Sequence, residues 1–173
     1  MRFVLAFALS SVLLAACSGG GLAKPPTPGP TPTRGAVAGT DTEYMRQVCR
    51  AFGRYLTDFG AETQRDPNLF SDQAKLLRVA APILATFAKD LDKAKPPKDM
   101  ANYHDALVER VKTSASKAKG GLVLTSAELG NFSKDAPLPP VTVRERMADA
   151  ASSVPECAAS GGADALFGDT EGR

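Results

Sequence analysis

After Thr40, the apolar residues of this 173-residue chain recur every three or four positions, which is the spacing of one face of an α-helix. The first such face consists of Tyr44, Val48, Phe52, Tyr55 and Phe59. Similar stretches follow after Ser71, after Pro97 and after Thr142, and no segment of the sequence shows the strict alternation typical of a β-strand. The spacing therefore predicts an all-α fold, an antiparallel bundle of about four helices.

Residues that favour helix ends mark the expected boundaries of these helices. Asp41 is expected to cap the first helix and Ser71 the second, because their side-chain oxygens can accept a backbone N–H. The segment Thr142 to Glu145 has the form of a capping box, and Pro155 is expected to end the fourth helix. Residues 122–132 are ambiguous, and a short helix across one end of the bundle is one interpretation of them.

The first sixteen residues have the three parts of a secretory signal peptide. Arg2 supplies a positive charge, Phe3 to Leu14 are mostly apolar, and two small residues follow. The apolar run is shorter than the roughly 20 residues that span a bilayer. The simplest interpretation of a leader alone is a secreted protein that is cut near Ala16 and released.

The leader ends in Leu14-Ala15-Ala16-Cys17, which resembles the lipobox of bacterial lipoproteins. The resemblance implies that the mature protein begins at Cys17, that a diacylglycerol is attached to the Cys17 sulfur, and that membrane lipid is therefore a partner. It also implies a location on the extracytoplasmic face of a bacterial membrane. Ser18, rather than aspartate, follows the cysteine and is compatible with the outer membrane where the host has one.

Composition divides the rest of the chain into three parts. Residues 17–40 hold the lipidated cysteine and a Pro/Gly/Thr-rich linker, which we expect to be a disordered tether. Residues 41–160 form the helical domain, whose length is sufficient for one core. Residues 161–173 are expected to be a flexible tail.

The chain has three cysteines, and assigning Cys17 to lipid leaves Cys49 and Cys157. Because exported proteins often fold in an oxidising compartment, we predict a disulfide between them rather than two free buried thiols. The bridge would tie the first helix to the end of the last. It would close a loop of about a hundred residues, worth up to about 4.7 kcal/mol in the chain-entropy model.

The sequence contains little that points to catalysis. Lys and Arg number 21 against 19 Asp and Glu, and Trp is absent, so nothing favours binding to nucleic acid. His104 is the only histidine and is expected to be partly exposed rather than a metal, haem or proton-transfer group. The carboxylate pairs Asp58–Glu62 and Asp105–Glu109 are interpreted as surface charges, and no nucleophile motif is present. We therefore predict neither an enzyme nor a cofactor or metal site.

A row of three arginines, Arg46, Arg50 and Arg54, follows one side of the first predicted helix. Glu43 can pair with Arg46 and Asp58 with Arg54, which leaves Arg50 without an obvious partner in its own helix. We interpret the row as a solvated face or as the source of an ion pair to another helix. An anionic lipid headgroup or an acidic protein surface is the functional alternative.

These features predict a membrane-anchored lipoprotein whose helical domain contacts another protein of the cell envelope or has a structural role there. Residues 96–111 and the preceding helix, which contains Pro82, are similar to small, otherwise uncharacterised helical lipoproteins of bacteria. The alternative is a small-molecule or ion-binding module. Its pocket would lie between helices, opened by a bend at Pro82 and lined by Tyr44, Tyr55 and Tyr103.

Overall fold

The computed structural model describes residues 38–133, 136–161 and 164–167. The predicted signal peptide, the lipidation site Cys17 and nearly all of the linker lie outside these residues. Within them, every regular element is helical, which confirms the predicted all-α class. None of the described helices combines the length and apolar character needed to cross a membrane.

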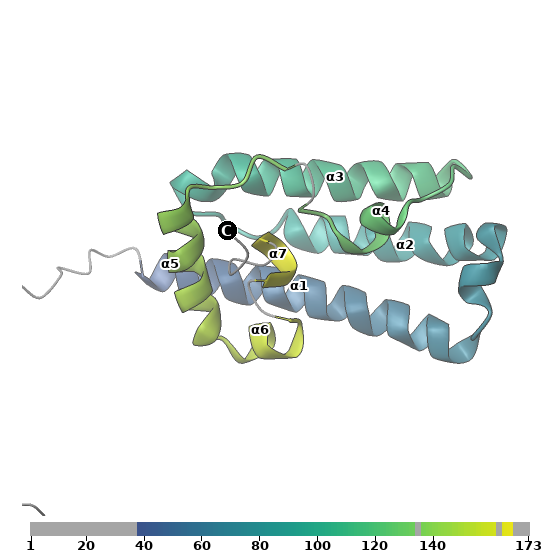
Figure 1. The fold of residues 1–173 in the computed structure, drawn as a ribbon, viewed down its shortest axis with the longest axis horizontal. Helices are drawn as coiled ribbons and strands as arrows, with labels where there is room; N and C mark the ends of the chain where they lie inside the picture. The colour runs from purple at the N-terminus through teal and green to yellow at the C-terminus, as the bar shows by residue number, and fades with distance from the viewer. Residues whose placement is uncertain (1–37, 134–135, 162–163, 168–173) are drawn as a thin grey trace, which may run out of the picture. The chain divides into compact units, whose positions relative to one another are not determined.

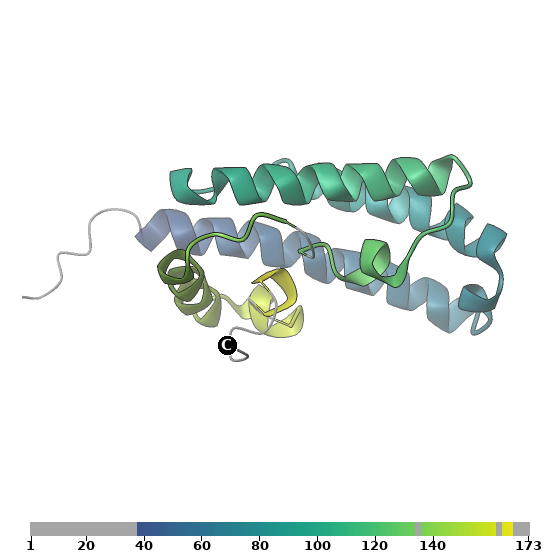
Figure 2. The same cartoon turned by 45° about the horizontal axis from the view of Figure 1, so that its top comes forward.

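Three long helices form the body of the domain: α1 (Ala38–Arg65), α2 (Gln73–Leu91) and α3 (Ala101–Lys119). Consecutive helices are antiparallel, and α2 packs against both of the others (Figures 1 and 2). Short 3₁₀ turns enter α2 and α3, η1 (Leu69–Ser71) and η2 (Lys98–Met100). The long helices therefore have the predicted antiparallel arrangement.

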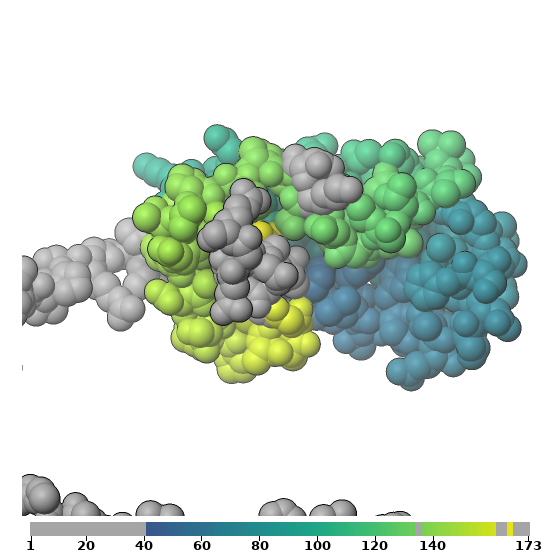
Figure 3. All heavy atoms as spheres, in the orientation of Figure 1, coloured from purple at the N-terminus to yellow at the C-terminus, as the bar shows by residue number. Residues whose placement is uncertain are grey.

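Four shorter helices complete the bundle: α4 (Ser126–Gly130), α5 (Val141–Ser152), α6 (Pro155–Ala159) and α7 (Asp164–Phe167). Helices α5 and α6 pack on α1, and α4 contacts α3. In Figure 3, α5 and α6 cover the early turns of α1 on the face shown, whereas the start of α2 remains in view. The predicted fourth helix corresponds to α5, and α6 follows it as a separate short helix.

The apolar faces predicted from the spacing form the core. Tyr44, Val48, Phe52 and Tyr55 of α1 are all buried. The Tyr55 ring stacks on Phe87 of α2, with ring centroids 4.9 Å apart. Each large apolar side chain buried in this way contributes about 1.5–3 kcal/mol, so the shared core is the main source of stability.

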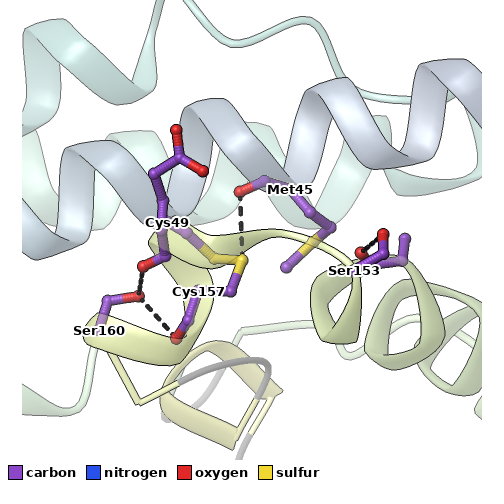
Figure 4. Close-up of a disulfide and its surroundings, with 7 residues drawn as sticks. Met45, Cys49, Ser153, Cys157 and Ser160 are labelled. Carbon is purple, nitrogen blue, oxygen red and sulfur yellow. Dashed lines mark hydrogen bonds between the residues drawn. A yellow bond between two sulfur atoms is a disulfide. The ribbon is translucent and has the colours of Figure 1, made fainter.

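A disulfide joins Cys49 of α1 to Cys157 of α6, as predicted from the cysteine count (Figure 4). The two Cα atoms are 4.9 Å apart, and both residues are 1% exposed. The Cys157 sulfur also lies 3.6 Å from the carbonyl oxygen of Met45. The covalent link therefore reaches α6, one short helix beyond the point at which we expected the last helix to end.

The start of α1 differs from the prediction. The helix begins at Ala38, so Asp41 lies in its first turn and is not the N-cap. Asp41 is only 2% exposed, and its carboxylate is 2.8 Å from Nε of Arg146 in α5. Arg146 also donates two hydrogen bonds to Asp99 of η2, at 2.8 and 2.9 Å. This arginine thereby links the first turn of α1, η2 and α5.

Two further caps form at residues other than those predicted. Ser71 ends η1, and the N-cap of α2 is Asp72, whose Oδ1 accepts the Lys75 N–H at 2.9 Å. The predicted capping box at 142–145 does not form, because α5 already begins at Val141, directly after Pro140. A capping box is found instead at Thr125 and Glu128, at the start of α4.

Two other boundaries also move. Pro155 does not simply end a helix but occupies the first turn of α6, where its missing N–H costs nothing. Beyond the predicted domain end, Leu166 and Phe167 of α7 are buried. The hydroxyl of Tyr103 donates to the Leu166 carbonyl oxygen. The packed domain therefore extends past residue 160, into the segment predicted to be a flexible tail.

Candidate functional site

His104 is buried, in contrast to the partly exposed position that we predicted. The residue is 4% exposed, because it lies on the face of α3 that also carries the core residues Leu107 and Val111. Its Nδ1 lies 3.3 Å from the Tyr44 hydroxyl. Burial lowers the pKa of His104, and the nearby carboxylate of Asp105 opposes this effect only in part. The neutral imidazole is therefore a packed core group.

The tyrosines that were expected to line an interhelical pocket are used in the core instead. Tyr55 donates its hydroxyl hydrogen bond to the Leu129 carbonyl oxygen, just as Tyr103 does to Leu166. Burial raises the pKa of Tyr55 to about 12. With each hydroxyl satisfied by a core partner, the tyrosines hold helices together and do not surround a cavity.

The carboxylate pairs predicted to be surface charges make ordinary ion pairs. Asp58 lies 3.7 Å from Arg54, and Glu109 lies 3.3 Å from Lys112. In the described ranges, no group of three or more histidine, cysteine, aspartate or glutamate residues is arranged to hold a metal ion. At least one carboxylate of each pair thus has a cationic partner that balances its charge.

The arginine row on α1 makes the contacts expected from its spacing. Arg46 pairs with Glu43 within the helix. Arg50, which lacked such a partner, reaches Glu156 of α6 at 2.8 Å. Arg54 binds Asp90 of α2 at 3.2 Å, in addition to its longer contact with Asp58 in α1. Both cross-helix pairs confirm the interpretation that the row supplies ion pairs to other helices.

Between α1 and α2, part of this row borders a surface depression of about 370 Å³, which we call the cationic hollow. It is lined by Gln47, Arg50, Ala51, Arg54, Asp90 and Lys93. Asp90 accepts from Lys93 at 2.7 Å, and this hydrogen bond is the largest cause of the lowered pKa of Asp90. A site of this composition can bind an anion through guanidinium and ammonium groups that protein carboxylates already hold in place.

A second depression, of about 340 Å³, lies between α2 and α3. Its charged lining residues are Asp92, Asp105, Glu109 and Lys112, and His104 borders it. Carboxylates outnumber cations here, so the two sides of α2 carry hollows of opposite charge. We call this second depression the acidic hollow.

Sequence patterns alone did not predict the cationic hollow, because its residues come from two helices. Arg54 and Asp90 are 36 positions apart in the chain. The one available signal was Arg50, whose missing partner in its own helix pointed to a contact elsewhere.

Comparison with protein-family models, with curated proteins and with solved structures found no match to this chain.

Proposed function

We propose that this chain is a membrane-anchored, extracytoplasmic lipoprotein of a bacterial envelope, with a helical domain that serves as a non-enzymatic interaction or structural module. The observation that carries the proposal is the Cys49–Cys157 disulfide, which uses both cysteines other than Cys17. Disulfides persist mainly in oxidising compartments outside the cytoplasm. The disulfide is therefore consistent with export by a leader that ends in a lipobox.

The anchor would act through the number of its acyl chains. One chain binds a bilayer only weakly, but each buried methylene adds about 0.8 kcal/mol, so two or three chains hold nearly permanently. The Pro/Gly/Thr-rich composition of the linker favours a spacer between lipid and domain. Such tethering raises the effective concentration of the domain near other envelope components, so that weak contacts become significant.

The placement of the reactive side chains supports a role in binding rather than catalysis. His104, the group best suited to proton transfer near neutral pH, packs against Tyr44 in the core. The arginines at the surface are held by carboxylates of neighbouring helices. These groups stabilise the bundle, and its outer faces remain for contacts with partners.

The anchor can be tested by expressing the full chain and its Cys17→Ser variant in a bacterial host and measuring intact masses in each cell fraction. We expect the unaltered chain in the membrane fraction, cut before Cys17 and carrying acyl mass, and no acyl mass on the variant. A released protein that is cut near Ala16 and carries no lipid would refute the anchor.

The interaction role needs a separate test. Crosslinking in the native membrane should yield an adduct between this chain and another envelope protein. Recovery of the monomer alone, under conditions that crosslink a known neighbouring pair, would contradict the role.

A small-molecule or ion-binding module remains the second candidate, and the cationic hollow is the observation that favours it. Its volume of about 370 Å³ falls within the range of small-ligand sites, roughly 300–1,000 Å³. A ligand present at about 100 times its Kd should stabilise the domain by about 2.7 kcal/mol. Thermal unfolding that no metabolite or metal in a broad panel shifts would count against this function.

A further inference from the structure

In the cationic hollow, the positive groups lie outside the carboxylates that hold them. The Arg50 side chain is 68% exposed, whereas its partner Glu156 is 30% exposed. Arg54 and Lys93 are 59% and 65% exposed, and both bind Asp90, which is 19% exposed. An anion approaching this surface therefore meets guanidinium and ammonium groups first, and the recessed carboxylates orient them.

The acidic hollow has the opposite layering. Lys112 is 46% exposed, less than its partners Asp92 at 61% and Glu109 at 71%. Ion pairs between the same kinds of residue thus present negative groups in the acidic hollow, on the α3 side of α2, and positive groups in the cationic hollow, on the α1 side. The cationic surface is a local feature of the α1–α2 side, because a further depression between the same helices is bordered by Asp58, Glu62 and Arg65. Basic and acidic residues of the whole chain nearly balance, at 21 and 19.

The loop that follows α2 brings the backbone of a further lysine close to the cationic hollow. The backbone N–H of Lys95 donates to Oε1 of Gln47, a lining residue, at 3.3 Å. Lys95 is itself exposed. This contact fixes the loop beside α1, so that Lys93 and Lys95 both belong to the α1–α2 side.

The hollow lies around the middle of α1, the helix at whose start the tether joins the domain. Helix α1 begins at Ala38, and Arg50 follows about 18 Å further along the helix axis. The end of α2 lies beside the middle of α1, because Asp90 of α2 binds Arg54 of α1 at 3.2 Å. Along the helix axis, this surface is therefore closer to the point of attachment than the end of α1 at Arg65 is.

We propose that the cationic hollow is a docking surface for the phosphate headgroups of anionic phospholipids in the membrane that holds the anchor. Arg50 and Arg54 can each offer two N–H groups to phosphate oxygens, and Lys93 and Lys95 add point charges. Each lysine or arginine near an anionic membrane surface strengthens binding about fivefold. This gain in affinity becomes effective once a tether holds the domain close to the membrane. This inference rests on the proposed lipid anchor.

The test uses the mature lipidated protein in vesicles of phosphatidylcholine alone or mixed with phosphatidylglycerol. Acetylation of native lysines is followed by mass spectrometry, with Lys119 at the far end of α3 as the internal reference. We expect Lys93 and Lys95 to react several-fold more slowly in the mixed vesicles, Lys119 to be unchanged, and high salt to remove the difference. Equal rates in both kinds of vesicle would overturn the proposal.

Paired variants separate the specific surface from net charge. The double substitution Arg50→Gln and Arg54→Gln should restore the Lys95 rate to its value in phosphatidylcholine, since about 25-fold of surface affinity is removed. Arg65→Gln with Lys112→Gln changes net charge equally, keeps the reference Lys119 and should leave Lys95 protected. Far-UV circular dichroism confirms that both variants are folded. Protection that survives in the arginine variant would contradict the assignment.

Other outcomes identify other binders and exclude the lipid surface. Protection in phosphatidylcholine vesicles on addition of inorganic phosphate alone would indicate a small-anion site. Protection in native membranes but not in anionic vesicles would indicate an acidic protein. Absence of acyl mass on Cys17 would refute the anchor, and the surface proposal with it, whereas lipidated protein with unprotected lysines refutes the surface proposal alone.

Discussion

At the scale of single residues, His104 shows how burial sets the properties of an ionisable group. The imidazole packs edge-on against the Tyr44 ring, with centroids 5.6 Å apart. Loss of water around the ring disfavours the protonated form, and this effect exceeds the attraction of Asp105 and Asp92. The folded protein therefore holds His104 neutral at pH values at which the unfolded chain already takes up a proton.

This difference predicts a loss of stability in mild acid. The folded pKa of His104 is below the unfolded value of about 6.5. Its contribution to stability is therefore complete above about pH 6.5 and is lost as pH falls from there through the folded pKa. The free energy of unfolding, measured with urea from about pH 7.5 to about pH 5.5, should decrease more steeply for the unaltered protein than for His104→Asn. Parallel slopes would show that His104 does not titrate differently on folding.

At the scale of elements, the start of α2 depends on one side chain. Asp72 has an extended backbone, and its Oδ1 accepts the Lys75 N–H, which would otherwise have no partner within the helix. Ser71 belongs to η1 and makes no such cap. Either residue is an acceptable cap in the sequence, and the 3₁₀ turn before α2 decides between them.

Asp72→Ala should lower the free energy of unfolding by about 1 kcal/mol, because the cap is lost. Asp72→Asn should retain most of it, since the amide oxygen can accept the same bond. Ser71→Ala is the matched control and should change stability by less than about 0.5 kcal/mol. Urea unfolding at neutral pH measures all three, and an equal effect of the two alanine variants would contradict the assigned cap.

At the scale of the whole molecule, one covalent bond closes most of the domain into a loop. Cys49 and Cys157 are 108 positions apart, so the loop contains α2, α3, α4 and α5. It also holds α6 on α1, where the packing would otherwise depend on a helix of five residues. Closing a loop of this size restricts the unfolded chain much more than the folded one.

Reduction of the bond should therefore lower the free energy of unfolding by up to about 4.7 kcal/mol in the chain-entropy model. The double variant Cys49→Ala and Cys157→Ala should be similarly destabilised, and a reductant should not affect it. Urea midpoints with and without dithiothreitol, together with a count of free thiols, provide the measurement. A reduced protein with two free thiols and an unchanged midpoint would contradict a stabilising role.

Several features of this protein follow from local patterns in its sequence. The buried face of α1, from Tyr44 to Tyr55, was predictable because helical periodicity depends only on neighbouring positions. The disulfide was predictable because Cys17, once assigned to lipid, leaves a single pair. The lipid anchor itself stays a prediction, since Cys17 lies outside the described residues.

Other features depend on which surfaces meet when the helices pack. The burial of Asp41 follows from Arg146 on α5, and that of His104 from Tyr44 on α1. The cationic hollow likewise needs α1 and α2 side by side. Helical spacing specifies a face but not its neighbour. The environment and partner of each charged group are therefore set by contacts between residues that are distant in the chain.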